Sequence, residues 1–155
     1  DTFNLRFINI YKKFSYFLKS VKDIILIELS SGYENISNNI LEQLDILVVN
    51  IPQNNIAIKD LIKQKEIMEK VVFIIGSYDA DSENNINNIR RKYGIDEKNI
   101  YAIPYNIRFK DAICSGRSQE YYERHLESKK NDSEYEFMKH LDSISEMIIK
   151  RCGIG

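Results

Sequence analysis

The sequence predicts an α/β fold, in which a mostly parallel sheet is covered by helices on both faces. Four short runs of branched apolar residues are continuous rather than alternating, which is typical of strands buried on both faces. Segments with helical spacing of apolar residues separate these runs, and strands that alternate with helices indicate a parallel sheet. The 155 residues, 43% of them hydrophobic, suffice for a single domain, residues 1–155, with a sizeable core.

The first half of the chain supplies two of the predicted strands and three helices. Apolar residues at helical spacing over 3–20 predict an amphipathic helix, and the run 24–28 follows it as the first strand. A second helix is expected over roughly 35–44, before the second strand at 46–50. A third helix is expected over roughly 55–69.

The third and fourth strands flank a helix with clear end signals. The run 71–75 predicts the third strand and the run 100–103 the fourth. Asp81 or Ser82 is the expected N-cap of the helix between them, because a short polar side chain can accept from the first free N–H groups. Gly94 is the expected end of that helix, since glycine adopts the left-handed conformation at low cost.

The C-terminal third of the chain predicts two more helices and a loop. A short helix is expected near 109–115, and the polar stretch 127–133 is the most loop-like part of the sequence. Ser133 and Glu136 have the spacing of a capping box, which predicts the start of a last helix over about 134–151. One apolar stripe of that helix consists of Phe137, Leu141, Ile144 and Ile148.

Within the sheet, the four strands are expected to run parallel to one another. Their most central residues should be buried, and the pattern assigns Ile25, Ile27, Val48 and Phe73 to the core. Antiparallel pairing among these strands would contradict the predicted fold class.

Charge and cysteine content narrow the classes of function. The net charge is −1, so we expect this chain alone to bind nucleic acid weakly or not at all, although Arg90 to Lys92 form a short basic run. The two cysteines, Cys114 and Cys152, are far apart and predict free thiols in a cytoplasmic protein. We find no apolar run long enough for a membrane span and no signal-peptide pattern. The chain begins at Asp1 rather than Met, which suggests a part of a larger protein.

Polar and small residues follow each predicted strand. Ligands of open parallel sheets bind beyond the carboxyl ends of the strands, so these residues mark the expected site. Each of them also suits a plain turn or cap, and the sequence leaves both interpretations open. In chain order they are Glu28, Ser30, Ser31 and Gly32, then Asn50, Pro52 and Gln53, then Ser77, Tyr78 and Asp79, and finally Pro104, Tyr105 and Asn106.

Four motifs in this order resemble a known family. Residues 22–32 form an apolar strand that ends in an acid, a small-residue pair and a glycine, and 44–53 form a second strand followed by Pro-Gln. The third strand, 71–78, is followed by the Ile-Pro-x-Asn stretch within 103–108. Over roughly residues 15–125 the chain resembles the C-terminal portion of MinD/ParA-type P-loop ATPases, the deviant Walker group, which includes degenerate CpaE/TadZ-like members.

The resemblance implies an ATPase that in complete form binds ATP with magnesium, dimerises, and positions DNA, a pilus or other cargo. It implies a P-loop NTPase-like sheet that here lacks the P-loop strand, with this chain as the C-terminal part of the ATPase domain. Glu28 corresponds to the acid of the magnesium site, where the family usually has Asp. The nucleotide-binding positions it implies are Ser30, Gly32, Gln53, Ser77, Tyr78, Pro104 and Asn106.

A second interpretation belongs to a different class of protein. The 155 residues contain no G-x-x-x-x-G-K-[ST] loop or deviant form of it, so phosphates have no lysine-bearing cradle in this chain. We therefore expect the chain alone to bind no ATP or other cofactor and to catalyse no hydrolysis. The alternative is a degenerate, non-catalytic α/β scaffold that binds a protein partner.

Overall fold

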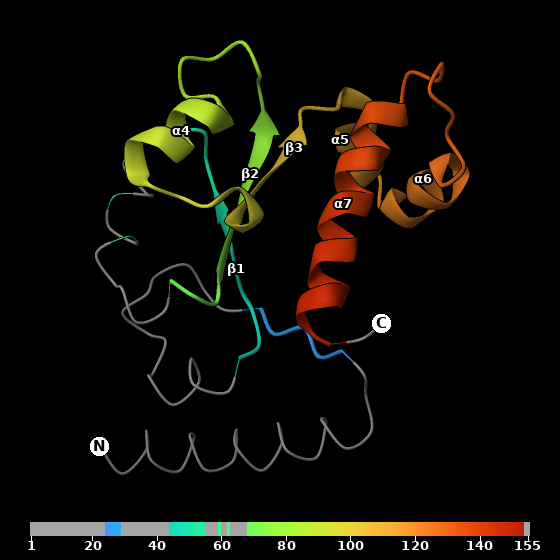
Figure 1. The fold of residues 1–155 in the computed structure, drawn as a ribbon. Coiled ribbons are helices and arrows are strands. Elements are labelled where there is room, and N and C mark those ends of the chain that lie inside the picture. The colour runs from blue at the N-terminus through green and yellow to red at the C-terminus, as the bar shows by residue number, and fades with distance from the viewer. Residues whose placement is uncertain (1–23, 29–43, 55–58, 60–61, 63–67, 154–155) are drawn as a thin grey trace.

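The computed structural model describes residues 24–28, 44–54, 59, 62 and 68–153, and within them a parallel sheet (Figure 1). The strands are β1 (Leu47–Ile51), β2 (Val71–Tyr78) and β3 (Ile100–Pro104). Their order is β1-β2-β3, and both pairings are parallel. The predicted α/β class and three of the four predicted parallel strands are therefore confirmed in the part of the chain that the structure describes.

One face of the sheet packs against α4 (Ile86–Tyr93), as Figure 1 shows. Val71, Phe73 and Ile75 of β2 alternate toward this face and are fully buried there. Ile89 of α4 lies against them, in one cluster with Leu47 and Ile51 of β1. Alternate residues of a strand point to the same face, so the odd-numbered residues of β1 and β2 build this half of the core.

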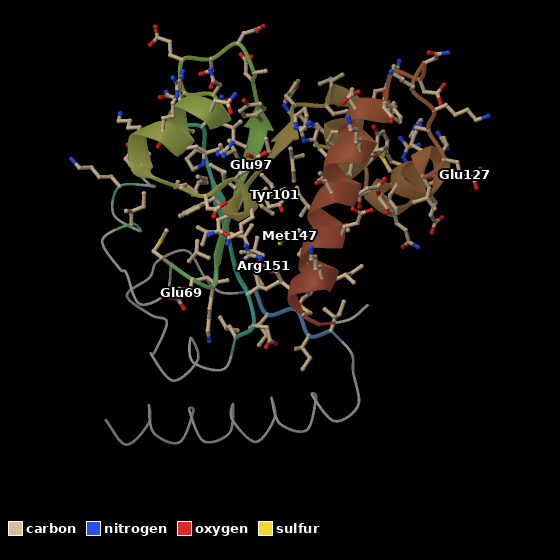
Figure 2. The ribbon with its side chains drawn as sticks, viewed as in Figure 1. Glu69, Glu97, Tyr101, Glu127, Met147 and Arg151 are labelled. Carbon is tan, nitrogen blue, oxygen red and sulfur yellow. The ribbon has the colours of Figure 1, made fainter. Side chains whose placement is uncertain are left out.

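The opposite face packs against α7 (Tyr135–Arg151), which lies on the other side of the sheet in Figure 1. Val72 and Ile74 of β2 meet Ile144 and Met147 of α7 in a second core cluster, with Tyr101 beside it. Figure 2 shows Tyr101 and Met147 lying between β3 and α7. The prediction of helices on both faces is confirmed by these two clusters.

A third cluster joins α7 to two short helices, α5 (Ile107–Cys114) and α6 (Ser118–His125). Buried Ala112, Tyr121 and Phe137 come from the three helices, and Phe109 packs against them. The rings of Phe109 and Phe137 are 5.0 Å apart, and those of Phe109 and Tyr121 are 5.4 Å apart. These separations lie within the range of favourable aromatic pairs, so α5 and α6 are fixed to the N-terminal half of α7.

The C-terminal end of α7 is hydrogen-bonded to the chain segment before β3. Arg151 donates to the carbonyl oxygen of Lys98 at 2.9 Å and to the side chain of Asn99. Both acceptors belong to the short 3-10 helix Glu97–Asn99 that leads into β3. This contact holds the C-terminal end of α7 close to the start of β3.

The predicted strand at 24–28 is wrong. These residues adopt no regular secondary structure, and Leu26 is 84% exposed. Ile24 and Ile27 are exposed as well, and Ile25 is half-buried. A run of branched residues becomes a strand only where a neighbouring strand accepts its backbone hydrogen bonds, and none of the described strands pairs with this run.

Among the predicted core residues of the remaining strands, Phe73 is confirmed and Val48 is wrong. Phe73 is 0% exposed, whereas Val48 is 42% exposed. Val48 belongs to the face on which α7 packs, but α7 lies over β2 and β3. Within the described residues, α7 therefore covers β2 and β3 on that face and leaves Val48 of β1 exposed.

Two predicted helix starts differ from the structure, and one predicted helix end agrees with it. α4 begins later than predicted, because Asn85 rather than Asp81 or Ser82 accepts the hydrogen bond from the N–H of Asn88, at 3.1 Å. Gly94 ends α4 as predicted, with a φ of 66°. α5 begins at Ile107, two residues early, since Asn106 caps it.

The last helix is confirmed over Tyr135–Arg151, but its predicted capping box is wrong. Glu134 is the N-cap residue and makes no capping hydrogen bond. Ser133 instead donates to the Glu134 carboxylate. The sequence analysis also missed α6, since its only buried residue is Tyr121 and it offers no apolar stripe.

No helix in the described part of the chain is long and apolar enough to cross a membrane.

Candidate functional site

The carboxyl ends of β1, β2 and β3 meet at one edge of the sheet, because the strands are parallel and adjacent. Of the predicted site residues, Ser77 and Tyr78 lie in β2 and Pro104 ends β3. Gln53 follows β1 and Asn106 follows β3. We call this edge, with Gln53, Ser77, Tyr78, Pro104 and Asn106, the carboxyl edge.

The site residues predicted at and after the run 24–28 do not belong to the described carboxyl edge. Ser30, Ser31 and Gly32 lie outside the residues that the structure describes. Glu28 is described and exposed, but it does not end a strand, since residues 24–28 form none. The expected position of Glu28 directly after a strand is therefore wrong, and a magnesium-binding role for it stays a prediction.

Gln53 fixes the loop between β2 and α4. Its Oε1 accepts from the N–H of Asp79 at 2.9 Å, and its Nε2 donates to the carbonyl oxygen of Asp79 at 2.7 Å. The same Nε2 also donates to the carbonyl oxygen of Asn84, at 3.2 Å. The amide of Gln53 thus bonds to backbone groups on both sides of the loop and holds it at the end of β1.

Ser77 and Tyr78 turn the chain at the end of β2. Ser77 has a φ of 50°, a left-handed conformation that is uncommon for residues other than glycine. The register with β3 shifts at this point, and Tyr78 pairs with Pro104. The Tyr78 hydroxyl accepts from the N–H of Ile86 at 3.1 Å and so satisfies a free donor at the start of α4.

Asn50 and Gly76 meet where β1 and β2 end. A Cβ atom at position 76 would lie 3.3 Å from Oδ1 of Asn50, so the absent side chain of Gly76 leaves room for the Asn50 amide. Asn50 is exposed and presents this amide at the carboxyl edge. A side chain at position 76 would therefore require the Asn50 amide to shift by a few tenths of an ångström.

The most densely bonded polar group lies beside the carboxyl edge and was missed by the sequence analysis. Glu134 is 4% exposed, the one buried charged residue among those described. Its Oε2 accepts from Asn106 Nδ2 at 2.5 Å and from the Tyr121 hydroxyl. Its Oε1 accepts from Arg108 Nη1 at 2.9 Å and from Ser133 Oγ at 3.2 Å. We call these five residues the Glu134 cluster.

The Glu134 cluster joins the carboxyl edge to three helices. Asn106 accepts from the N–H of Phe109 at 2.8 Å to cap α5 while its amide nitrogen donates to Glu134. Tyr121 comes from α6, and Glu134 directly precedes α7. A buried carboxylate is tolerated only when its oxygens are hydrogen-bonded and its charge is paired, and here the bonds supply both.

Two pKa values are shifted in this cluster. Burial by itself raises the pKa of Glu134, but hydrogen bonds from Tyr121, Asn106 and Ser133 and the charge of Arg108 lower it below its ordinary 4.5. Burial, the hydrogen bond to Glu134 and its negative charge raise the pKa of Tyr121 above its ordinary 10.0. At neutral pH the pair is therefore a carboxylate and a protonated phenol, and neither group is poised to transfer a proton.

Three polar side chains of the carboxyl edge already form hydrogen bonds within the protein. Gln53, Tyr78 and Asn106 each bond to backbone or side-chain groups of the chain itself. Within the described residues no group of three or more His, Cys, Asp or Glu side chains is arranged to hold a metal ion.

No sequence signal would have found Glu134, because it stands in a run of charged and polar residues. Its burial results from the way α5, α6 and α7 meet, and local sequence does not encode that contact. By fold, the described chain is an α/β protein with a three-stranded parallel sheet. Comparison with known proteins finds no matching family model, no similar curated protein and no similar solved structure.

Proposed function

We propose that this chain is the C-terminal part of a MinD/ParA-like ATPase, which in complete form binds ATP with magnesium, dimerises and positions cargo. The supporting observation is the order of the strands that form the carboxyl edge. Three parallel strands follow one another in the sheet in chain order, and their ends carry Gln53, Tyr78, Pro104 and Asn106. These are four of the positions at which the resemblance implies contacts with the nucleotide.

The chemistry of hydrolysis in this proposal is positioning and charge stabilisation, and most of it lies outside this chain. A phosphate cradle needs several backbone N–H groups at a helix N-terminus together with a lysine. Magnesium is normally shared between protein oxygens and the phosphates, and Glu28 would supply one such oxygen. The carboxyl edge would bind the end of the nucleotide that carries the base.

A second candidate is a non-catalytic scaffold that binds a protein partner. The observation that favours it is the involvement of Gln53, Tyr78 and Asn106 in hydrogen bonds that hold the loops together. In this interpretation the side chains of the carboxyl edge stabilise the fold and bind no nucleotide. A polar edge used in this way needs no nucleotide to satisfy its donors and acceptors.

Calorimetric titration with Mg-ATP separates the two candidates. We expect no heat of binding for residues 1–155 and measurable binding for a longer protein that includes the natural residues upstream of Asp1. In that longer protein Glu28→Gln should lower turnover more than nucleotide affinity. The matched control is Glu127→Gln, which changes an exposed glutamate after α6 and should alter neither. If the longer protein binds Mg-ATP no better than residues 1–155, the scaffold is correct and the ATPase proposal is wrong.

A further inference from the structure

A hollow of about 260 Å³ lies between α5 and α6, and none of its lining residues belongs to the carboxyl edge. Three arginines line it and come from three places in the fold. Arg108 is in the first turn of α5, Arg117 lies in the turn between the helices, and Arg124 is in the last turn of α6. Tyr121 and His125 line it as well, with ring centres 4.7 Å apart.

Each guanidinium group is anchored to the protein by one or two hydrogen bonds. Arg108 Nη1 donates to Ser133 and Glu134, both at 2.9 Å. Arg117 Nε donates to Ser115 Oγ at 3.1 Å, and Arg124 Nη2 donates to Glu120 at 2.5 Å. A guanidinium has five N–H donors, so each of these arginines keeps further donors for a ligand. The anchoring bonds lower the entropy that a ligand must overcome to order these side chains.

The side chains that line the hollow include more guanidinium groups than carboxylates. The lining holds the three guanidinium groups and two carboxylates, of Asp111 and Glu120. Glu120 is paired with Arg124. Arg108 is paired with buried Glu134, whereas Arg117 has no ion pair among the described residues. Arg117 is thus the arginine of this lining whose guanidinium is held by no carboxylate among the described residues, and Asp111 is the other unpaired charge there.

Shape narrows the class of anion. Guanidinium groups that enter from three elements suit a tetrahedral oxyanion, whose oxygens point in different directions, better than a flat carboxylate with two. At about 30 Å³ per water molecule the hollow exceeds the size of a bare phosphate group. Ala112 and the rings of Tyr121 and His125 belong to the lining and could contact a few carbon atoms.

We propose that the hollow between α5 and α6 binds a phosphate monoester of a small molecule, with Arg117 as its principal cation. This site uses none of the residues of the proposed nucleotide edge and does not depend on the ATPase proposal. Arg108 is shared with the Glu134 cluster, so Arg117 is the residue to change without loosening the fold.

The test is a titration of the full 155-residue chain followed by amide NMR, at constant ionic strength. The probes are glycerol 3-phosphate, inorganic phosphate and glycerol. We expect glycerol 3-phosphate to cause saturable shifts at Ala112, Tyr121 and His125, and glycerol to cause none. Inorganic phosphate should bind at the same residues and more weakly, since it lacks the carbon atoms.

Arg117→Gln should weaken the binding of glycerol 3-phosphate about tenfold, the loss expected for one charge-assisted contact. Arg91→Gln is the matched control, because Arg91 is an exposed arginine of α4 that bonds only to Asn88 among described residues. It should leave the shifts unchanged. The proposal is overturned if the shifts are not saturable, if sodium chloride reproduces them, or if Arg117→Gln and Arg91→Gln behave alike. Tighter binding of inorganic phosphate than of the ester would overturn the monoester assignment.

Discussion

At the scale of single residues, position in the sheet decides which branched and aromatic side chains stabilise the protein. Phe73 and Val48 both stand in apolar runs, but Phe73 is 0% exposed and Val48 is 42% exposed. Phe73→Ala should lower the free energy of unfolding by about 3–5 kcal/mol, because it removes a large buried ring and leaves a cavity. Val48→Ala should cost at most about 1 kcal/mol, as expected for a half-exposed position. Urea denaturation of both variants checks this, and equal losses would show that the two faces of the sheet are misassigned.

At the scale of elements, the N-cap of α4 is the side chain of Asn85 rather than one of the acidic loop before it. Asn85 accepts from the N–H of Asn88, whereas Asp81 lies in the loop and does not cap the helix. Asn85→Ala should destabilise the chain by about 0.5–2 kcal/mol, and Asn85→Asp should retain most of the stability because it can cap in the same way. Asp81→Ala is the control and should change stability by less than about 0.5 kcal/mol. Thermal melts check this: if Asp81→Ala lowers the melting temperature more than Asn85→Ala does, the cap of α4 is not Asn85.

At the scale of the whole molecule, the Glu134 cluster links the edge of the sheet to α5, α6 and α7, and its charge makes stability depend on pH. The pKa of Glu134 is lower in the folded chain than its ordinary 4.5. The stability from this shift is present above about pH 4.5 and is lost as the pH falls through the folded-state pKa. Wild type should therefore lose more stability than Glu134→Gln between neutral pH and pH values below 4.5. Urea midpoints across this range check the difference, and parallel losses in the two proteins would contradict it.

The sequence by itself determined the strands at 46–50, 71–75 and 100–103, the stop of α4 at Gly94 and the long helix α7. Each depends on local physics: continuous apolar runs favour buried parallel strands, glycine permits a positive φ, and an apolar stripe at helical spacing needs one buried face. The carboxyl edge followed from these strands, because parallel strands end on the same side. The position of Gln53, Tyr78 and Asn106 at the carboxyl edge could therefore be predicted from the sequence.

Tertiary structure alone decided the features that depend on neighbours. The run 24–28 is as apolar as the other strands, but none of the described strands pairs with it, and its residues are left without regular structure. Val48 is exposed because α7 covers β2 and β3 on that face. Glu134 is buried because donors from Asn106, Arg108 and Tyr121 converge on it, although they stand 13 to 28 residues away in the chain. Pairing, coverage and charge compensation are contacts between distant segments, and no local pattern encodes them.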